Sequence, residues 1–66
     1  MTRKIGGVVI RLSWKTPDTL TLEAESGKKT LEIEGSREQV INDLDTSKPF
    51  DSQTTEKIKA LIKSFK

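Results

Sequence analysis

The clearest hydrophobic pattern lies at the C-terminal end of the chain, between Asp51 and Lys66. Its apolar residues recur at the i, i+3, i+4, i+7 spacing of one helical face, and they are Ile58, Leu61, Ile62 and Phe65. Asp51 or Ser52 is placed to cap the first turn. We therefore expect a helix over residues 51–66 whose apolar stripe needs another element to cover it, with Phe50 filling the corner before it.

Three upstream segments alternate between apolar and polar residues, which is the period-two pattern of half-buried strands. The residues expected to point inward are Val8, Ile10, Leu12 and Trp14 in the first segment, Leu20, Leu22 and Ala24 in the second, and Leu31 and Ile33 in the third. The segments are separated by Thr16-Pro17-Asp18-Thr19 and Ser26-Gly27-Lys28-Lys29, both typical of turns. The sequence therefore predicts three consecutive antiparallel strands.

The registers that the two turns impose agree with each other. The predicted cross-strand pairs are Trp14–Leu20, Leu12–Leu22, Ile10–Ala24, Leu22–Ile33 and Ala24–Leu31. Every pair joins two apolar side chains, and a slip of one residue would turn a whole strand inside out. The same registers place Arg11, Glu23 and Glu32 in one row across the opposite face.

A second, shorter helix is predicted between the strands and the C-terminal helix. Ser36-Arg37-Glu38-Gln39 reads as a capping box, and the apolar stripe that follows consists of Val40, Ile41 and Leu44. Pro49 ends the helix, because the residue before proline is disfavoured in the helical region. The predicted fold is α+β: a three-stranded antiparallel β-meander with two C-terminal helices packed on one face (βββαα), forming one compact domain over residues 1–66.

Two features of the N-terminus carry expectations of their own. Arg3-Lys4 is expected to be a solvated basic tail. Gly6-Gly7 is expected to form a bend, and the alternatives are a bulge or a close approach of another backbone. The first predicted strand is apolar on both faces around Val8-Val9-Ile10, so its free edge would favour strand addition or a homodimer. The alternative is that the glycines and the basic tail simply shield this edge.

Composition bounds the chemistry. The chain has 66 residues, 12 basic and 10 acidic, and contains no histidine, cysteine or tyrosine. The commonest general base, the usual metal ligands and two common nucleophiles are therefore missing, and we expect neither an enzyme nor a cofactor or metal site. The lack of cysteine favours a reducing compartment, hence a cytoplasmic location, and no apolar run has the length of a membrane span.

Two charged surfaces are candidates for binding. The first is the open face of the sheet, where the candidate residues are Arg11, Glu23, Glu25, Glu32 and Glu34. Glu23 and Glu32 should face each other across the strands. Such a pair can perform acid–base chemistry or bind a hard cation, but on a flat, open surface we interpret it as a solvated face. With lysines expected on the helical side, this separation of charge favours oriented docking onto a protein.

The second candidate surface is basic. Lys28 and Lys29 lie at a predicted turn, and Lys59 and Lys63 lie on the C-terminal helix. Together they could face phosphates, although exposed aromatic residues for base stacking are lacking. The leading hypothesis is a small non-enzymatic interaction or regulatory protein whose partner is another protein, bound through the acidic face or the first-strand edge. The alternative is a nucleic-acid-binding module that uses these lysines.

Overall fold

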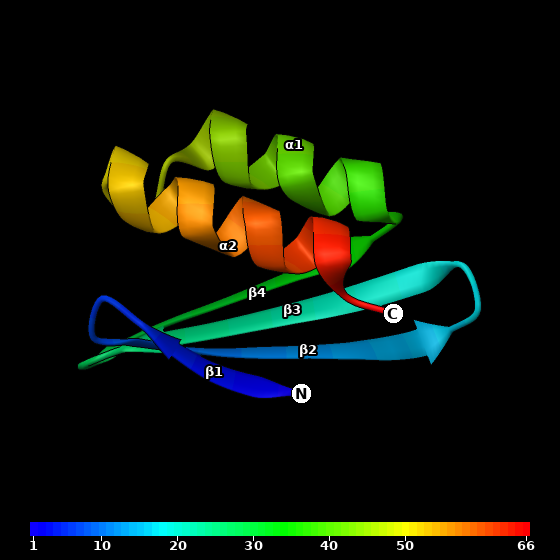
Figure 1. The fold of residues 1–66 in the computed structure, drawn as a ribbon, viewed down its shortest axis with the longest axis horizontal. Coiled ribbons are helices and arrows are strands. Elements are labelled where there is room, and N and C mark those ends of the chain that lie inside the picture. The colour runs from blue at the N-terminus through cyan, green and yellow to red at the C-terminus, as the bar shows by residue number, and fades with distance from the viewer.

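The computed structural model describes all 66 residues and consists of four strands followed by two helices (Figure 1). The strands are β1 (Thr2–Ile5), β2 (Val8–Thr16), β3 (Thr19–Ser26) and β4 (Lys29–Gly35), and the helices are α1 (Arg37–Ser47) and α2 (Ser52–Ser64). The strands pair in the order β1-β2-β3-β4, every neighbour antiparallel. Both helices lie on the same face of the sheet (Figure 1). The predicted α+β meander with two C-terminal helices is therefore confirmed, with one strand more than expected.

The additional strand is β1, where we expected a basic tail. β1 pairs with β2 so that Lys4 lies opposite Val9 and Ile5 opposite Val8. Gly6 and Gly7 form the intervening two-residue turn with φ angles of +55° and +81°, a left-handed conformation that favours glycine and suits a tight hairpin. Val9 and Ile10 are thus paired on both sides, and Val8 pairs with β1, so the free edge predicted there does not exist. The free edges of the sheet belong to β1 and β4.

The strand registers predicted from the apolar pattern are confirmed at each predicted pair. Leu12 lies opposite Leu22, and Leu22 lies opposite Ile33. The register shifts only between Trp14 and Thr16, directly before the Pro17 turn. Because the pleat alternates along each strand, these pairings also fix which polar residues share the opposite face.

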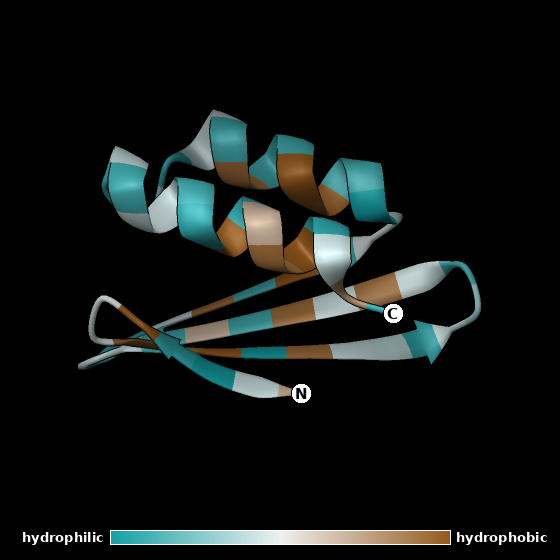
Figure 2. Ribbon diagram, viewed as in Figure 1, coloured by the Kyte–Doolittle hydropathy of each residue, from teal (hydrophilic) through white to brown (hydrophobic).

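The core fills the space between the sheet and the helices. Its buried apolar side chains are Val8, Ile10, Leu12, Leu20, Leu22, Ala24, Ile33, Val40, Leu44, Ile58 and Ile62, and all of them were predicted to point inward. Brown apolar positions accordingly face each other across the gap between the two layers (Figure 2). Leu61 and Phe65, which belong to the same predicted helical stripe, pack at the margin and are half-buried.

The two helices cover different parts of the sheet. α1 packs over β3 and β4, whereas α2 lies on the side of β1. The Ser36 hydroxyl accepts a hydrogen bond from the Gln39 amide at 3.2 Å, which confirms the predicted cap of α1. Asp51 occupies the N-cap of α2 without a capping bond from its side chain. Neither helix combines the length and the apolar character needed to cross a lipid bilayer.

One long-range contact joins the two helices to the sheet and was not predicted. Arg37, at the start of α1, donates hydrogen bonds to the carbonyl oxygens of Ile62 and Lys63 at 2.8 and 2.9 Å. Its guanidinium lies 5.5 Å from the centre of the Trp14 ring, which stacks on Phe65. A cation at these carbonyls also complements the negative end of the α2 dipole. Arg37 thus holds the C-terminal end of α2 against α1 and β2.

Candidate protein-interaction surface

The face of the sheet turned away from the helices, here called the outer face, is not covered by any part of the chain (Figure 1). Its side chains follow from the strand registers, which place them in rows across β1, β2, β3 and β4. One row is Thr2, Arg11, Glu23 and Glu32, and the next is Lys4, Val9, Glu25 and Thr30. The predicted row of Arg11, Glu23 and Glu32 is therefore present.

Three exposed glutamates gather on the β3 and β4 side of this face. We call Glu23, Glu25 and Glu32 the acidic surface. Glu23 lies directly opposite Glu32 on the neighbouring strand, and Arg11 lies opposite Glu23 on the other side. No ion pair neutralises any of the three carboxylates. They therefore concentrate negative charge that a cationic partner would neutralise.

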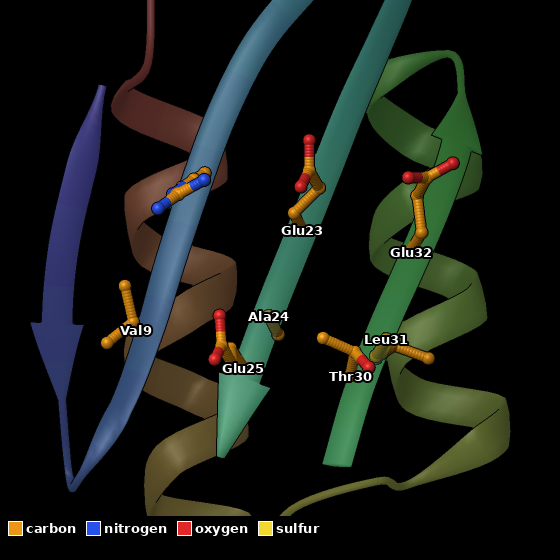
Figure 3. Close-up of a pocket in the computed structure, with 8 residues that line it drawn as sticks. Val9, Glu23, Ala24, Glu25, Thr30, Leu31 and Glu32 are labelled. Carbon is orange, nitrogen blue, oxygen red and sulfur yellow. The ribbon is translucent and has the colours of Figure 1, made fainter. Parts of the chain in front are cut away.

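The acidic surface borders a shallow depression of about 140 Å³ (Figure 3). Its lining residues are Val9, Arg11, Glu23, Ala24, Glu25, Thr30, Leu31 and Glu32. Val9 contributes a half-buried apolar surface beside the charged groups. The depression is open to solvent along the sheet, and no three acidic side chains approach closely enough to chelate a metal ion.

Glu34, the fourth predicted glutamate, lies on the same face but in a different environment. Its carboxylate forms an ion pair with the Lys15 ammonium at 2.8 Å. The hydrogen bond that Lys15 donates to Glu34, together with the negative charge of Glu34, raises the pKa of the Lys15 side chain above the ordinary value of 10.5. Lys15 was not among the predicted residues, although the β2–β3–β4 register placed it diagonally across from Glu34. Glu34 is thus neutralised by Lys15, whereas no ion pair neutralises the carboxylates of the acidic surface.

Basic residues predominate on one half of the molecule and acidic residues on the other, and the boundary runs between β2 and β3. We had expected the two signs of charge to be divided between the open face of the sheet and the helical side. The basic half, which we define as β1, β2 and α2, carries seven basic residues and one acidic residue: Arg3, Lys4, Arg11, Lys15, Lys57, Lys59, Lys63 and Glu56. The acidic half, which we define as β3, β4 and α1, carries seven acidic and two basic residues: Glu23, Glu25, Glu32, Glu34, Glu38, Asp43, Asp45, Lys29 and Arg37. Each helix thus has the sign of charge of the strands beneath it.

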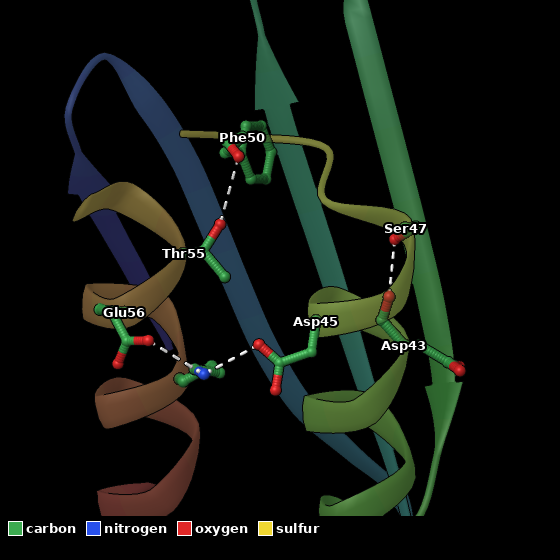
Figure 4. Close-up of polar contacts among 7 residues, drawn as sticks. Asp43, Asp45, Ser47, Phe50, Thr55 and Glu56 are labelled. Atoms are coloured by element: carbon green, nitrogen blue, oxygen red, sulfur yellow. Dashed lines mark hydrogen bonds and ion pairs between the residues drawn. The ribbon is translucent and has the colours of Figure 1, made fainter. Parts of the chain in front are cut away.

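The predicted basic residues do not form one surface. Lys28 and Lys29 lie at the turn between β3 and β4. This turn is at the opposite end of the molecule from the C-terminal end of α2, the helix end that carries Lys63 (Figure 1). Lys59 lies between the helices, where its ammonium contacts Asp45 at 2.8 Å and Glu56 at 3.1 Å (Figure 4).

The environment of Lys59 also limits its availability to a ligand. Its side chain is only 15% exposed. Hydrogen bonds to Asp45 and then to Glu56 raise the pKa of Lys59 above 10.5. Its positive charge is therefore retained but already neutralised by two carboxylates. The pair with Glu56 joins residues three positions apart on α2, whereas the contact with Asp45 on α1 depends on helix packing that the sequence alone did not reveal.

Comparisons with protein-family models, with curated proteins and with solved structures found no match to this chain. The functional argument therefore depends on the geometry and the charges of the surfaces described above.

Proposed function

We propose that the protein is a small, non-enzymatic interaction protein that binds a positively charged segment of another protein through the acidic surface. The observation that carries this proposal is the register itself: Glu23, Glu25 and Glu32 are neighbours on an uncovered sheet face and have no ion-pair partners. A compact sheet fixes the backbone positions of these residues. A partner would therefore meet carboxylates whose spacing is largely set before binding.

The depression beside these glutamates suits a lysine or arginine side chain in particular. Such a side chain has an apolar stem and a charged end. The stem would lie against Val9, and the charged end would lie among the three carboxylates. Arg11, at the border of the depression, would repel a second cation placed too close to β2 and so orient the partner.

A binding experiment with defined probes tests this proposal. The probe is a fluorescent peptide in which lysine alternates with threonine, and its glutamate counterpart serves as the negative control. We expect the lysine peptide to bind the wild-type chain at low salt, and the double substitution Glu23→Lys and Glu25→Lys to weaken binding by more than about tenfold. The matched control is the double substitution Glu38→Lys and Asp43→Lys, which makes the same change of charge at two exposed carboxylates on α1, on the other side of the sheet from the acidic surface.

Two outcomes would contradict the proposal. One is the absence of binding by the lysine peptide at low salt. The other is an equal loss of binding in the α1 double variant and the sheet double variant, because a nonspecific response to net charge would then explain the result. Far-ultraviolet circular dichroism of each variant establishes that its fold is intact.

Nucleic-acid binding is the second candidate function, and the observation that favours it is the basic half. A duplex and a single-stranded oligonucleotide therefore belong in the same experiment. Lys63→Glu would weaken nucleic-acid binding, and affinity would fall steeply with salt because bound phosphates release counterions. Lys59→Glu is a poorer test, since Lys59 already holds two carboxylates. Tighter binding of an oligonucleotide than of the lysine peptide would favour this second function.

A further inference from the structure

The two free edges of the sheet carry opposite charges. β1, at one edge, contains Arg3 and Lys4 and no acidic residue. β4, at the other edge, presents Glu32 and Glu34 on its outward positions, of which Glu34 is already paired with Lys15, and its one basic residue, Lys29, lies at the end next to the turn. Charged residues on an edge strand usually prevent sheets from joining. Here repulsion opposes pairing between two copies of β1 or two copies of β4, but it does not oppose pairing of β1 with β4.

The backbone of β1 has free hydrogen-bonding groups at its outer edge. The amino group of Met1 donates to the Leu12 carbonyl, and the Leu12 amide donates to the Met1 carbonyl, both at 2.9 Å. Residues in an antiparallel ladder alternate between bonded and non-bonded pairs, so Arg3 and Ile5 also bond to β2. The amides and carbonyls of Thr2 and Lys4 therefore point away from the sheet.

The backbone of β4 has the matching arrangement. The two-residue turn at Gly27 and Lys28 makes Ser26 and Lys29 the closing pair of the β3–β4 hairpin. By the same alternation, the amides and carbonyls of Glu32 and Glu34 point outward from β4. On both edges, the residues with free backbone groups are those whose side chains lie on the outer face. Two such edges can therefore pair without reversing the pleat of either strand.

The order of the strands also permits this pairing. The four strands alternate in direction, so β1 of a second copy placed beside β4 is antiparallel to it when both copies have the same orientation. The helices of both copies then lie on one side of the extended sheet. α2 of the second copy lies beside α1 of the first, which brings the basic half of one molecule against the acidic half of the next.

We propose that the protein associates with itself head to tail, with β1 of one copy adding to β4 of another. The register that pairs opposite charges sets Lys4 of the second copy against Glu32 of the first. The same register places Ile5 of the second copy opposite Leu31. Leu31, Pro49 and Phe50 border a hollow of about 230 Å³ at this end of β4, and Ile5 would extend the apolar surface there.

The proposed contact between β1 and β4 is short, so we expect it to be weak. β1 has four residues, so few backbone hydrogen bonds form and the buried area falls within the class of weak, transient interfaces. The two surfaces that meet are different, so the contact repeats from one copy to the next. We therefore expect a mass that rises gradually with concentration and falls with salt.

Sedimentation velocity at low salt tests the proposal over protein concentrations from about 50 μM to about 1 mM, the range suited to a weak interface. We expect the average mass of the wild-type chain to rise above that of the monomer. Lys4→Glu or Glu32→Lys alone should weaken association by at least about tenfold, and the double exchange should restore it. Thr2→Pro should weaken it without any change of charge, since proline removes an amide that points out of the sheet.

The results decide the proposal in either direction. A constant monomer mass in the wild-type chain up to the highest concentration would overturn it. So would association that persists in both Lys4→Glu and Thr2→Pro, because copies would then be joined through another surface. Thr2 and Lys4 lie outside the acidic surface, so loss of association with unchanged binding of the lysine peptide separates this proposal from the proposed function. All three substituted residues are exposed, and circular dichroism checks the fold of each variant.

Discussion

The two faces of the sheet are built on the same strands but serve different ends. On the inner face, Leu12, Leu22 and Ile33 form a row of apolar side chains enclosed by the helices. The neighbouring row, one residue away on each strand, lies on the outer face and consists of Ser13, Thr21 and Glu34, which are half-buried or exposed. Strand alternation thus determines the face on which each side chain lies. The helices determine which of the two faces is buried and so stabilises the fold. The outer face remains free to bind.

The largest expected effect on stability comes from comparing two neighbouring residues of β3 that lie on opposite faces of the sheet. Leu22→Ala removes a fully enclosed side chain and should lower the free energy of unfolding by about 2–5 kcal/mol. Thr21→Ala changes the adjacent outward residue and should alter it by no more than about 0.5 kcal/mol. Urea denaturation followed by circular dichroism measures both. Equal effects at the two positions would contradict the assignment of the faces.

The sequence sufficed to predict the inner face because its signals are local and agree with one another. The alternation in the three longer strands gave one set of inward residues, and the two-residue turn at Gly27 independently gave the register of the second hairpin. At the Pro17 turn, Thr16 lies opposite Thr19, and an irregularity between Trp14 and Thr16 restores the register that the apolar pattern predicts. The capping residue Ser36 was recognised in the same way. The row of Arg11, Glu23 and Glu32 followed directly, since the residues between inward positions must share the other face.

The features that were missed depend on contacts that alternation does not encode. β1 has charged residues on both faces at Arg3 and Lys4, so it lacks the period-two pattern, and its only local signal is the Gly6-Gly7 turn. The ion pair of Lys59 with Asp45 joins two helices whose relative placement was unknown. Arg37 was recognised only as part of a capping box, although it also bonds to residues 25 and 26 positions away.

A second prediction compares two arginines on opposite sides of the sheet. Arg37 bonds to two carbonyls at the end of α2 and lies over the Trp14 ring. Arg37→Gln should therefore lower the free energy of unfolding by about 1–2 kcal/mol. Arg11→Gln, on the outer face, should have a much smaller effect because Arg11 forms no ion pair. If urea denaturation showed equal losses of unfolding free energy in the two variants, the contact between Arg37 and α2 would not contribute to stability as predicted.

A third prediction is that the outer face can be made more stable. Glu32 lies directly opposite Glu23, and like charges in such positions repel. Glu32→Gln should raise the free energy of unfolding by about 0.2–1 kcal/mol at low salt. Glu25→Gln is the matched control, since Glu25 lies between Val9 and Thr30. The same Glu32→Gln substitution should weaken binding of the lysine peptide, so a stability gain that left binding intact would argue against the acidic surface as the binding site.

The smallest expected effect concerns the ion pairs of two lysines, one on each side of the sheet. Lys15 on the outer face is 64% exposed, whereas Lys59 between the helices is 15% exposed. Because folding raises the pKa of both lysines, each pair contributes stability that is complete below the ordinary pKa of 10.5. This contribution is lost as the pH rises through the raised pKa of the folded state. No cysteine or tyrosine side chain titrates in the same range.

Urea denaturation from pH 8 upward can therefore isolate these two pairs. Stability should fall less steeply at high pH in Lys15→Gln and in Lys59→Gln than in the wild-type chain. About 0.5 M salt should abolish the difference for Lys15, which solvent surrounds, and leave part of it for Lys59, because shielded pairs are screened less. If salt abolished both differences equally, the position of Lys59 between the helices would have no electrostatic consequence. The contrast between the covered and the open side of the sheet would then be one of apolar packing alone.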